Sequence, residues 1–104
     1  MTPEEAAARS DLHLLDVREP DEWQAGHIAG AQHIPLGELR ERLGEVPKDR
    51  TVLAVCRSGS RSEAAMRGLR TLGYTVENLE GGMTAWKRAG LPLEAEGGAP
   101  GRVI

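Results

Sequence analysis

The sequence predicts an α/β domain of three layers, in which helices cover both faces of a central, mainly parallel sheet of four or five strands. Three observations lead to this fold class. Short apolar segments typical of strands alternate with segments of helical periodicity, and the connections between them are short. The clearest strand, at residues 51–56 (TVLAVC), is apolar on both faces from Val52 to Val55, as expected of a strand buried between two helical layers. A chain of 104 residues suffices for one domain and is too short for two.

The chain opens with the sequence features of a helix start. Thr2 is the expected N-cap, and Pro3 occupies the first helical position. Glu5, three residues after the threonine, completes a capping box. We expect a short helix that runs to about Arg9.

Two strand-like segments follow this helix. Residues 12–17 (LHLLDV) are mostly apolar and form the expected first strand. Residues 31–34 (AQHI) form a weaker second strand, which stops at Pro35 because proline lacks the N–H that a sheet requires. The polar residues between the two strands are expected to form a loop.

The middle of the chain continues with a helix and then the clearest strand. Leu36, Leu39 and Leu43 are spaced to lie on one face of a helix, and Gly44 is suited to end it. Residues 51–56 then form the strand that we expect at the centre of the sheet.

The last predicted elements are a helix, a strand and a short helix. Ser60 and Glu63 have the spacing of a second capping box, which places a helix start near Ser60. The apolar face of this helix consists of Ala65, Leu69 and Leu72. Residues 74–79 (YTVENL) supply a further strand, and residues 83–90 (MTAWKRAG) supply the last helix.

Composition limits the function classes. The net charge of −3 argues against a general nucleic-acid binder, and no apolar run approaches the roughly 18 residues that a membrane span needs. The acidic, helical start is unlike a signal peptide, so we expect a cytoplasmic protein, with a monomer favoured. The single cysteine excludes an internal disulfide. We expect residues 1–93 to form the domain and the Gly- and Pro-rich residues 94–104 to form a tail.

The only cysteine, Cys56, lies where the apolar strand changes into the sequence RSGSR. Ligands of parallel sheets bind beyond the carboxyl ends of the strands, and here a helix is expected to begin about four residues later. The backbone N–H groups of such a loop converge on an anion. The residues that we expect to line this anion site are Arg57, Ser58, Gly59, Ser60 and Arg61, with a further hydroxyl from Ser62. Positive charge and N–H groups stabilise a thiolate, so the pattern favours a nucleophilic cysteine over an inert core cysteine.

The spacing of the loop bears on its substrate. Residues 57–70 carry four arginines against one glutamate, which favours a small anion. Cysteine phosphatases use a Cys-x5-Arg loop, whereas Cys56 and Arg61 form Cys-x4-Arg, which suits a smaller group. Thiolate attack on the sulfane sulfur of thiosulfate fits, because sulfite leaves without needing a proton. A phosphatase or arsenate reductase remains an alternative.

Three blocks of the chain resemble the rhodanese family of sulfurtransferases, in its single-domain form. They are CRSGSR at the loop, DVREPDEWQAGHIAGAQHIP upstream of it, and GGMTAWKRAGLPL near the end. The resemblance implies that Cys56 forms a persulfide, that the main-chain amides of residues 57–61 hold it, and that Arg61 helps to bind the anion. It implies no metal or organic cofactor. The loop is unlike the Cys-Gly-Ser/Thr-Gly pattern of mercaptopyruvate sulfurtransferases, so thiosulfate is the expected donor, with cyanide, a thiol or a protein thiol as acceptor.

The upstream block is expected to support the site rather than to react. Asp16, Arg18 and Glu22 are expected to form hydrogen bonds and ion pairs that fix the loops around the cysteine. His27 is interpreted as structural rather than as a base, because an activated cysteine needs none. The three histidines and one cysteine match no zinc pattern, so no metal site is predicted.

One alternative from a different class stays open. The chain could be a non-catalytic binding or sulfur-carrier module on the same fold, because a fold does not determine a function. The cysteine and the basic loop after it count against this alternative.

Overall fold

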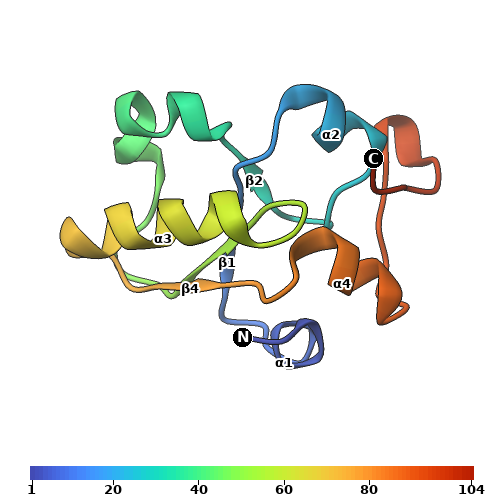
Figure 1. Cartoon of the computed structure of the whole chain (residues 1–104), viewed down its shortest axis with the longest axis horizontal. Helices are drawn as coiled ribbons and strands as arrows, with labels where there is room; N and C mark the ends of the chain where they lie inside the picture. Colours follow the sequence, from blue (N-terminus) through green and yellow to red (C-terminus); the bar gives the residue numbers. More distant parts are fainter.

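The computed structural model describes residues 1–104 and has the α/β architecture that the sequence predicts (Figure 1). The strands are β1 (His13–Asp16), β2 (Gln32–His33), β3 (Val52–Val55) and β4 (Val76–Asn78). They form one fully parallel sheet in the order β2-β1-β3-β4. The α-helices are α1 (Pro3–Ala7), α2 (Pro20–Ala25), α3 (Ser60–Thr71) and α4 (Gly82–Arg88), and the 3-10 helices are η1 (Leu36–Glu38), η2 (Arg40–Glu45) and η3 (Glu96–Gly98).

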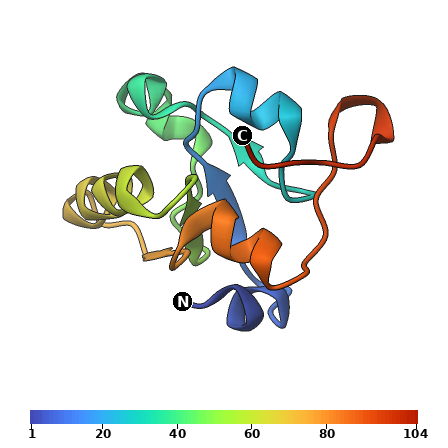
Figure 2. The same ribbon diagram turned by 45° about the vertical axis from the view of Figure 1, so that its right-hand side comes forward.

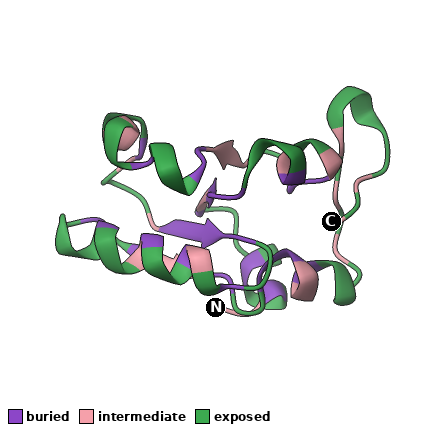
Figure 3. Ribbon diagram, turned by 45° about the horizontal axis from the view of Figure 1, so that its top comes forward, coloured by how far each residue is buried: buried purple, intermediate pink, exposed green.

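Strand β3 is buried on both faces, as its apolar sequence predicts (Figure 3). It pairs with β1 on one side and β4 on the other, so that Ala54 is in register with Leu15 and Asn78. Because side chains alternate along a strand, successive residues of β3 enter two different apolar clusters. Val52 and Ala54 belong to one cluster and Leu53 and Val55 to the other.

The two clusters correspond to the two helical layers (Figures 1 and 2). The first cluster takes Ala65 and Leu69 from α3, and Leu39 from the segment between η1 and η2. The second takes Ala6 from α1 and Trp86 from α4, and these two helices contact each other. The sheet is therefore covered on both faces, and α3 lies on the same side as the even-numbered residues of β3.

The first helix is capped as predicted. The Glu5 N–H donates to the Thr2 hydroxyl over 3.1 Å, and the Thr2 N–H donates to the Glu5 carboxylate over 2.9 Å. The helix ends at Ala7, two residues before the predicted end.

Two sequence predictions in the first half of the chain are wrong. The polar segment between β1 and β2 contains helix α2, which has Pro20 at its first position and a hydrogen bond from the Glu19 N–H to the Glu22 carboxylate. The helix predicted from the leucines at 36, 39 and 43 is two short 3-10 helices, η1 and η2, with a non-helical residue at Arg42. The three-residue step from Leu36 to Leu39 suits a 3-10 helix as well as an α-helix, whereas the four-residue step from Leu39 to Leu43 wrongly favoured an α-helix.

The segment after residue 93 runs beside α2 (Figure 1). His27 and Glu94 exchange two backbone hydrogen bonds of 2.9 and 3.0 Å, and the Arg102 N–H donates to the Ala25 carbonyl over 2.8 Å. The division between domain and tail at residue 93 stays a prediction. No helix of the chain is both long enough and apolar enough to cross a bilayer.

Candidate functional site

Cys56 lies immediately after β3, at the carboxyl edge of the sheet where ligands of parallel sheets bind. Its thiol is free, and the residue is 1% exposed. The side chain faces the α3 layer, because it continues the alternation of Val52 and Ala54. A buried thiol at a strand end must find its polar partners in the loop that follows, which we call the Cys56 loop (residues 56–61).

Neutral hydrogen-bond donors surround the Cys56 sulfur. The Gly59 N–H donates to Sγ over 3.0 Å, and the Ser62 hydroxyl oxygen lies 3.2 Å from Sγ. Burial by itself raises the pKa of the Cys56 thiol, but hydrogen bonds from the Ser62 hydroxyl and from the N–H groups of Ser62, Gly59 and Ser58 outweigh it and lower the pKa below its ordinary value. The loop therefore stabilises negative charge on the sulfur.

Gly59 makes this arrangement possible. Its φ of +108° is strained for any residue with a Cβ, and it turns the loop into α3 as the N-cap. The predicted capping role of Ser60 is wrong: Ser60 is the first residue of α3, and no side chain caps the helix. The turn at Gly59 carries the chain into the helix without a capping hydroxyl. Arg57, Ser58 and Ser60 are exposed around the loop.

The start of α4 fixes the Cys56 loop through backbone hydrogen bonds. The Met83 N–H donates to the Cys56 carbonyl over 2.8 Å, and the Thr84 N–H donates to the Arg57 carbonyl over 3.0 Å. Only glycine fits at position 82, because a Cβ there would lie 2.6 Å from the Arg57 carbonyl carbon and oxygen. These bonds turn the loop carbonyls toward α4, which leaves the loop N–H groups facing the sulfur. In the sequence, the only visible sign of this support is the Gly81-Gly82 pair at the start of the last helix.

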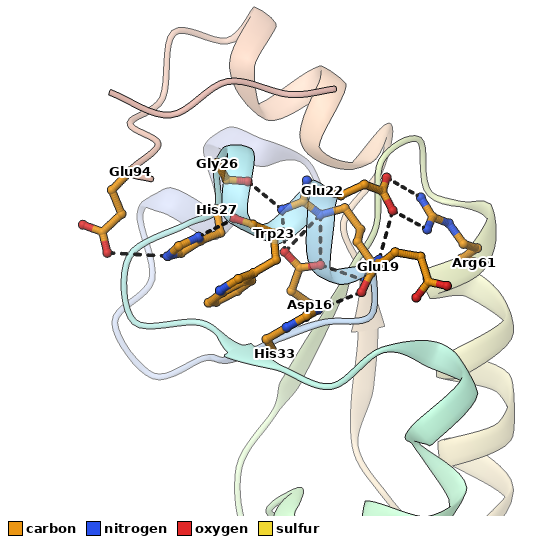
Figure 4. A network of polar contacts seen from close by, with 10 residues as sticks. Asp16, Glu19, Glu22, Trp23, Gly26, His27, His33, Arg61 and Glu94 are labelled. Atoms are coloured by element: carbon orange, nitrogen blue, oxygen red, sulfur yellow. Dashed lines mark hydrogen bonds and ion pairs between the residues drawn. The ribbon is translucent and has the colours of Figure 1, made fainter. Parts of the chain in front are cut away.

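Arg61 connects the Cys56 loop to α2 (Figure 4). Its guanidinium donates two hydrogen bonds to the Glu22 carboxylate, of 2.7 and 2.8 Å. This pairing lowers the pKa of Glu22 to about 2, since the guanidinium favours the ionised carboxylate. A guanidinium has five N–H groups, so three of those on Arg61 are not used by Glu22 and can meet an anion.

Asp16 and Arg18 form a fully buried ion pair at the end of β1. Arg18 Nη2 donates to the Asp16 carboxylate over 2.8 Å and to the Gly26 carbonyl over 2.7 Å. The Arg18 N–H also donates to the same carboxylate over 3.0 Å, while Arg18 Nη1 has no hydrogen-bond partner. The pair thereby ties the end of β1 to the end of α2, on the strand next to β3, where Asp16 is in register with Val55.

His27 lies beyond α2 and makes no contact with Cys56. Its imidazole stacks on Trp23 at 3.7 Å between ring centroids, and its Nδ1 donates to the Trp23 carbonyl over 2.8 Å. His33 stacks on the same indole at 4.8 Å (Figure 4). Glu94 lies 3.9 Å from His27 Nε2. These contacts are those of a packed ring and place no base beside the sulfur.

The structure adds Asn78, which sequence reasoning did not select. Its Nδ2 donates to the Gly59 carbonyl over 3.0 Å, and its Oδ1 lies 2.6 Å from the Ser62 hydroxyl oxygen. Asn78 is the last residue of β4, and only the pairing of β4 with β3 brings it to the loop. No sequence pattern near Asn78 indicated this position. No group of three or more His, Cys, Asp or Glu side chains is arranged to hold a metal ion.

The chain is similar to proteins of one family. The sequence-family model of the rhodanese-like domain matches residues 2–89 of this chain. A sulfurtransferase from Allochromatium vinosum is 44% identical over 93 residues, which cover 88% of this chain and 87% of that protein. An HTH-type transcriptional regulator from Mycobacterium tuberculosis is 42% identical over 110 residues, or 95% of this chain, and the chain spans only 48% of that regulator's length.

A solved structure agrees with the sequence matches. The crystal structure of a rhodanese-related protein from Thermoplasma volcanium has a TM-score of 0.90 and 34% sequence identity to this chain. The match covers 92% of this chain and 97% of that one. The fold, the family model and these similarities agree, and the chain belongs to the rhodanese-like domain family.

Proposed function

We propose that this chain is a sulfurtransferase, which moves a sulfane sulfur from thiosulfate or a similar small anionic donor to a thiophilic acceptor through a persulfide on Cys56. The observation that carries the proposal is the set of neutral donors around Cys56 Sγ, formed by the Gly59 N–H and the Ser62 hydroxyl. The similarity to a protein named sulfurtransferase supports it. The acceptor is cyanide in an assay, and a small thiol or protein thiol in the cytoplasm that the sequence predicts.

The proposed reaction has two balanced steps. The Cys56 thiolate attacks the outer sulfur of thiosulfate, the S–S bond of thiosulfate breaks, and sulfite leaves with the electron pair. The terminal sulfur of the persulfide then carries the negative charge. In the second step an acceptor such as cyanide attacks that sulfur, the persulfide S–S bond breaks, and thiocyanate leaves while the Cys56 thiolate returns. Neither step needs a base, a metal or a redox cofactor.

The surroundings of the sulfur suit this chemistry. The negative charge stays on sulfur throughout, and the N–H groups of the Cys56 loop are fixed before the reaction by their carbonyl bonds to α4. The side chain of Arg61 is partly exposed, and its N–H groups that do not bind Glu22 would supply positive charge for a small anion. The loop is one residue shorter than a Cys-x5-Arg phosphatase loop, which disfavours a phosphoryl substrate.

Intact mass spectrometry tests the proposal directly. After incubation with thiosulfate and removal of the excess, we expect a gain of about 32 Da on Cys56, which cyanide then removes. The Cys56→Ser variant is the control and should remain folded but gain no sulfur. Continuous formation of thiocyanate from thiosulfate and cyanide should accompany the adduct.

Other outcomes would favour the alternatives. A stable adduct without turnover, for any thiol acceptor tried, supports a sulfur-carrier module. Hydrolysis of an aryl phosphate, lost in Cys56→Ser, supports a phosphatase and overturns the proposal. No adduct from thiosulfate or from other sulfane donors supports a non-catalytic binding module.

A further inference from the structure

The Ser62 hydroxyl lies close to three hydrogen-bond acceptors, although it can donate only one hydrogen bond. Its oxygen lies 2.6 Å from Asn78 Oδ1. The same oxygen lies 3.2 Å from Cys56 Sγ and 3.2 Å from the Gly59 carbonyl oxygen. A hydroxyl carries one hydrogen, so only one of these contacts can be a strong hydrogen bond at a time.

The orientation of the Asn78 amide decides which acceptor holds the hydrogen in the resting site. Nδ2 faces the Gly59 carbonyl oxygen at 3.0 Å, and this oxygen can only accept a hydrogen bond. Turning the amide over would bring two carbonyl oxygens together. Oδ1 is therefore the atom that faces Ser62, and the short 2.6 Å distance fits a hydroxyl that donates to it.

We propose that Asn78 is a positioning residue for the sulfur: its amide holds the Ser62 hydroxyl hydrogen while Cys56 is a neutral thiol and releases it to the sulfur when the sulfur becomes negatively charged. In the neutral state the Ser62 oxygen is left with free lone pairs, and the thiol can donate to it. Once Cys56 Sγ is a thiolate, a hydrogen bond to that charge is stronger than one to a neutral amide, so the hydroxyl rotates toward it. This inference rests on the proposed sulfur transfer only for its part in turnover.

No charged group competes for this role. The hydrogen bonds to Sγ come from the neutral Gly59 N–H and Ser62 hydroxyl. The charged groups near the loop on α3 and α2 are Arg61 and Glu22, and they bind each other. Arg57 on the loop and Glu19 at the N-cap of α2 are exposed, and neither is among the groups that shift the pKa of Cys56. The side chain of Glu77, next to Asn78 on β4, pairs with Arg70. A change in the hydrogen bonding of Ser62 should therefore register directly in the ionisation of Cys56.

A double-mutant cycle tests the proposal. The variants are Asn78→Ala, Ser62→Ala and the two together, and the readout is the Cys56 pKa from the pH dependence of thiolate absorbance and of alkylation by iodoacetamide. Ser62→Ala should raise the pKa by about one unit, because a donor to the thiolate is lost. Asn78→Ala should lower the pKa by roughly half a unit, because the competing acceptor is gone. In the Ser62→Ala background the same asparagine substitution should not lower it.

The cycle separates competition for the hydroxyl from simple support of the loop. Removing Asn78 also removes the hydrogen bond to the Gly59 carbonyl, but this loss is the same in both backgrounds. An equal pKa change in the presence and absence of the Ser62 hydroxyl would overturn the proposal. Glu77→Ala, the neighbouring change on β4, should leave the Cys56 pKa unchanged.

If Asn78→Ala does not fold, a more conservative variant provides the same test. Asn78→Asp keeps the side-chain shape but replaces the donor with a second acceptor, so it should raise the Cys56 pKa more when the Ser62 hydroxyl is present than when it is absent. An equal rise in both backgrounds would contradict the proposal.

The Cys56 pKa measurements and the sulfur-transfer assay test the two proposals independently. Alkylation and absorbance need no sulfur donor, so coupling between Asn78 and Ser62 without any sulfur transfer would reject the proposed function and keep the positioning role. Sulfur transfer without coupling between Asn78 and Ser62 would keep the proposed function and reject the positioning role. Where both hold, the acid limb of kcat/KM for thiosulfate should shift with the Cys56 pKa in each variant.

Discussion

Two connections leave the carboxyl edge of the sheet side by side, and they are built from different chemistry. The connection from β3 into α3 surrounds the Cys56 sulfur with backbone N–H groups and the Ser62 hydroxyl. The connection from β1 to α2 is held by charged side chains, the buried Asp16–Arg18 pair above all. One ion pair, between Arg61 and Glu22, joins the two (Figure 4).

The two connections differ because the charge that each must stabilise differs. The charge on Cys56 comes and goes with ionisation, so neutral, fixed donors can stabilise it without leaving a buried charge unpaired in the thiol state. Asp16 and Arg18 form an ion pair that is buried in the core, where each charge needs the other as its partner. The β1–α2 connection therefore should determine stability, and the Cys56 loop should determine reactivity.

The largest expected effect tests the charged connection. Arg18→Met leaves the Asp16 carboxylate buried without its partner, so the free energy of unfolding should fall by about 3–5 kcal/mol. Urea unfolding followed by circular dichroism measures this. The reactivity of Cys56 with iodoacetamide, per folded molecule, should stay within about twofold, since the hydrogen bonds to Sγ come from Ser58, Gly59 and Ser62 and not from Asp16 or Arg18.

Two controls sharpen this test. Arg9→Met breaks an exposed ion pair with Asp11 and should change stability far less than Arg18→Met does, because solvent screens the exposed pair. Asp16→Leu combined with Arg18→Met removes both charges and should recover much of the loss. A strong change in Cys56 reactivity in folded Arg18→Met would break the proposed division between the two connections.

The second prediction tests the backbone that supports the loop. In Gly82→Ala the added methyl group overlaps the Cys56 and Arg57 carbonyls, so the loop must move away from α4. We expect a loss of about 3 kcal/mol in stability together with a rise in the Cys56 pKa, because the N–H groups no longer face the sulfur. Gly73→Ala is the matched control: its φ is also positive, at +91°, but a Cβ there meets nothing within 4 Å. An equal effect of the two variants on Cys56 would mean that the contact with α4 does not orient the loop.

The fold was largely predictable because the strands are encoded locally. The apolar run from Val52 to Val55 identified β3 as a central strand, and the capping box of Thr2 and Glu5 located the first helix. Helix α2 was missed because its polar residues show no apolar periodicity, although Pro20 after Glu19 offered a start signal. The 3-10 helices were misassigned because the leucine spacing of three and then four residues is typical of an α-helix.

The candidate site was predictable where it is contiguous in sequence. The position of Cys56 between a buried strand and a Gly-containing loop indicated the cradle of N–H groups. Asn78 reaches the Cys56 loop only through the pairing of β4 with β3. The start of α4 reaches it only because α4 packs against the sheet. Such tertiary contacts leave no local pattern, which is why sequence reasoning could not find Asn78.

The third prediction concerns the residue where the two connections meet. Arg61→Ala removes positive charge and N–H donors, so the KM for thiosulfate should rise about tenfold, with a smaller change in kcat. Stability should fall by no more than about 1 kcal/mol, because the arginine is partly exposed. Arg67→Ala, which breaks a more exposed pair with Glu63 on the same helix, should leave KM unchanged. A loss of stability with unchanged KM per folded molecule would assign Arg61 to the charged connection alone.

The smallest expected effect is the pH dependence of the same ion pair. The pKa of Glu22 is lowered from 4.5 to about 2 in the folded protein, since Arg61 favours the carboxylate. The unfolded chain therefore binds a proton at higher pH than the folded one. The stabilisation from the pair is complete above about pH 4.5 and is lost as the pH falls toward 2. Because Arg61 is partly exposed, we expect a loss of only about 1 kcal/mol.

Urea unfolding at pH 6 and pH 3 measures this loss by comparing the chain with Glu22→Gln. The glutamine variant should be less stable at pH 6, and the difference should shrink at pH 3, where the unfolded chain takes up a proton that the folded chain excludes. Glu41→Gln, an exposed carboxylate without an ion pair, should show no such convergence. A constant difference between the chain and Glu22→Gln at both pH values would mean that Glu22 acts through the shape of its α2 capping contact with the Glu19 N–H, and that the two connections are joined by packing rather than by charge.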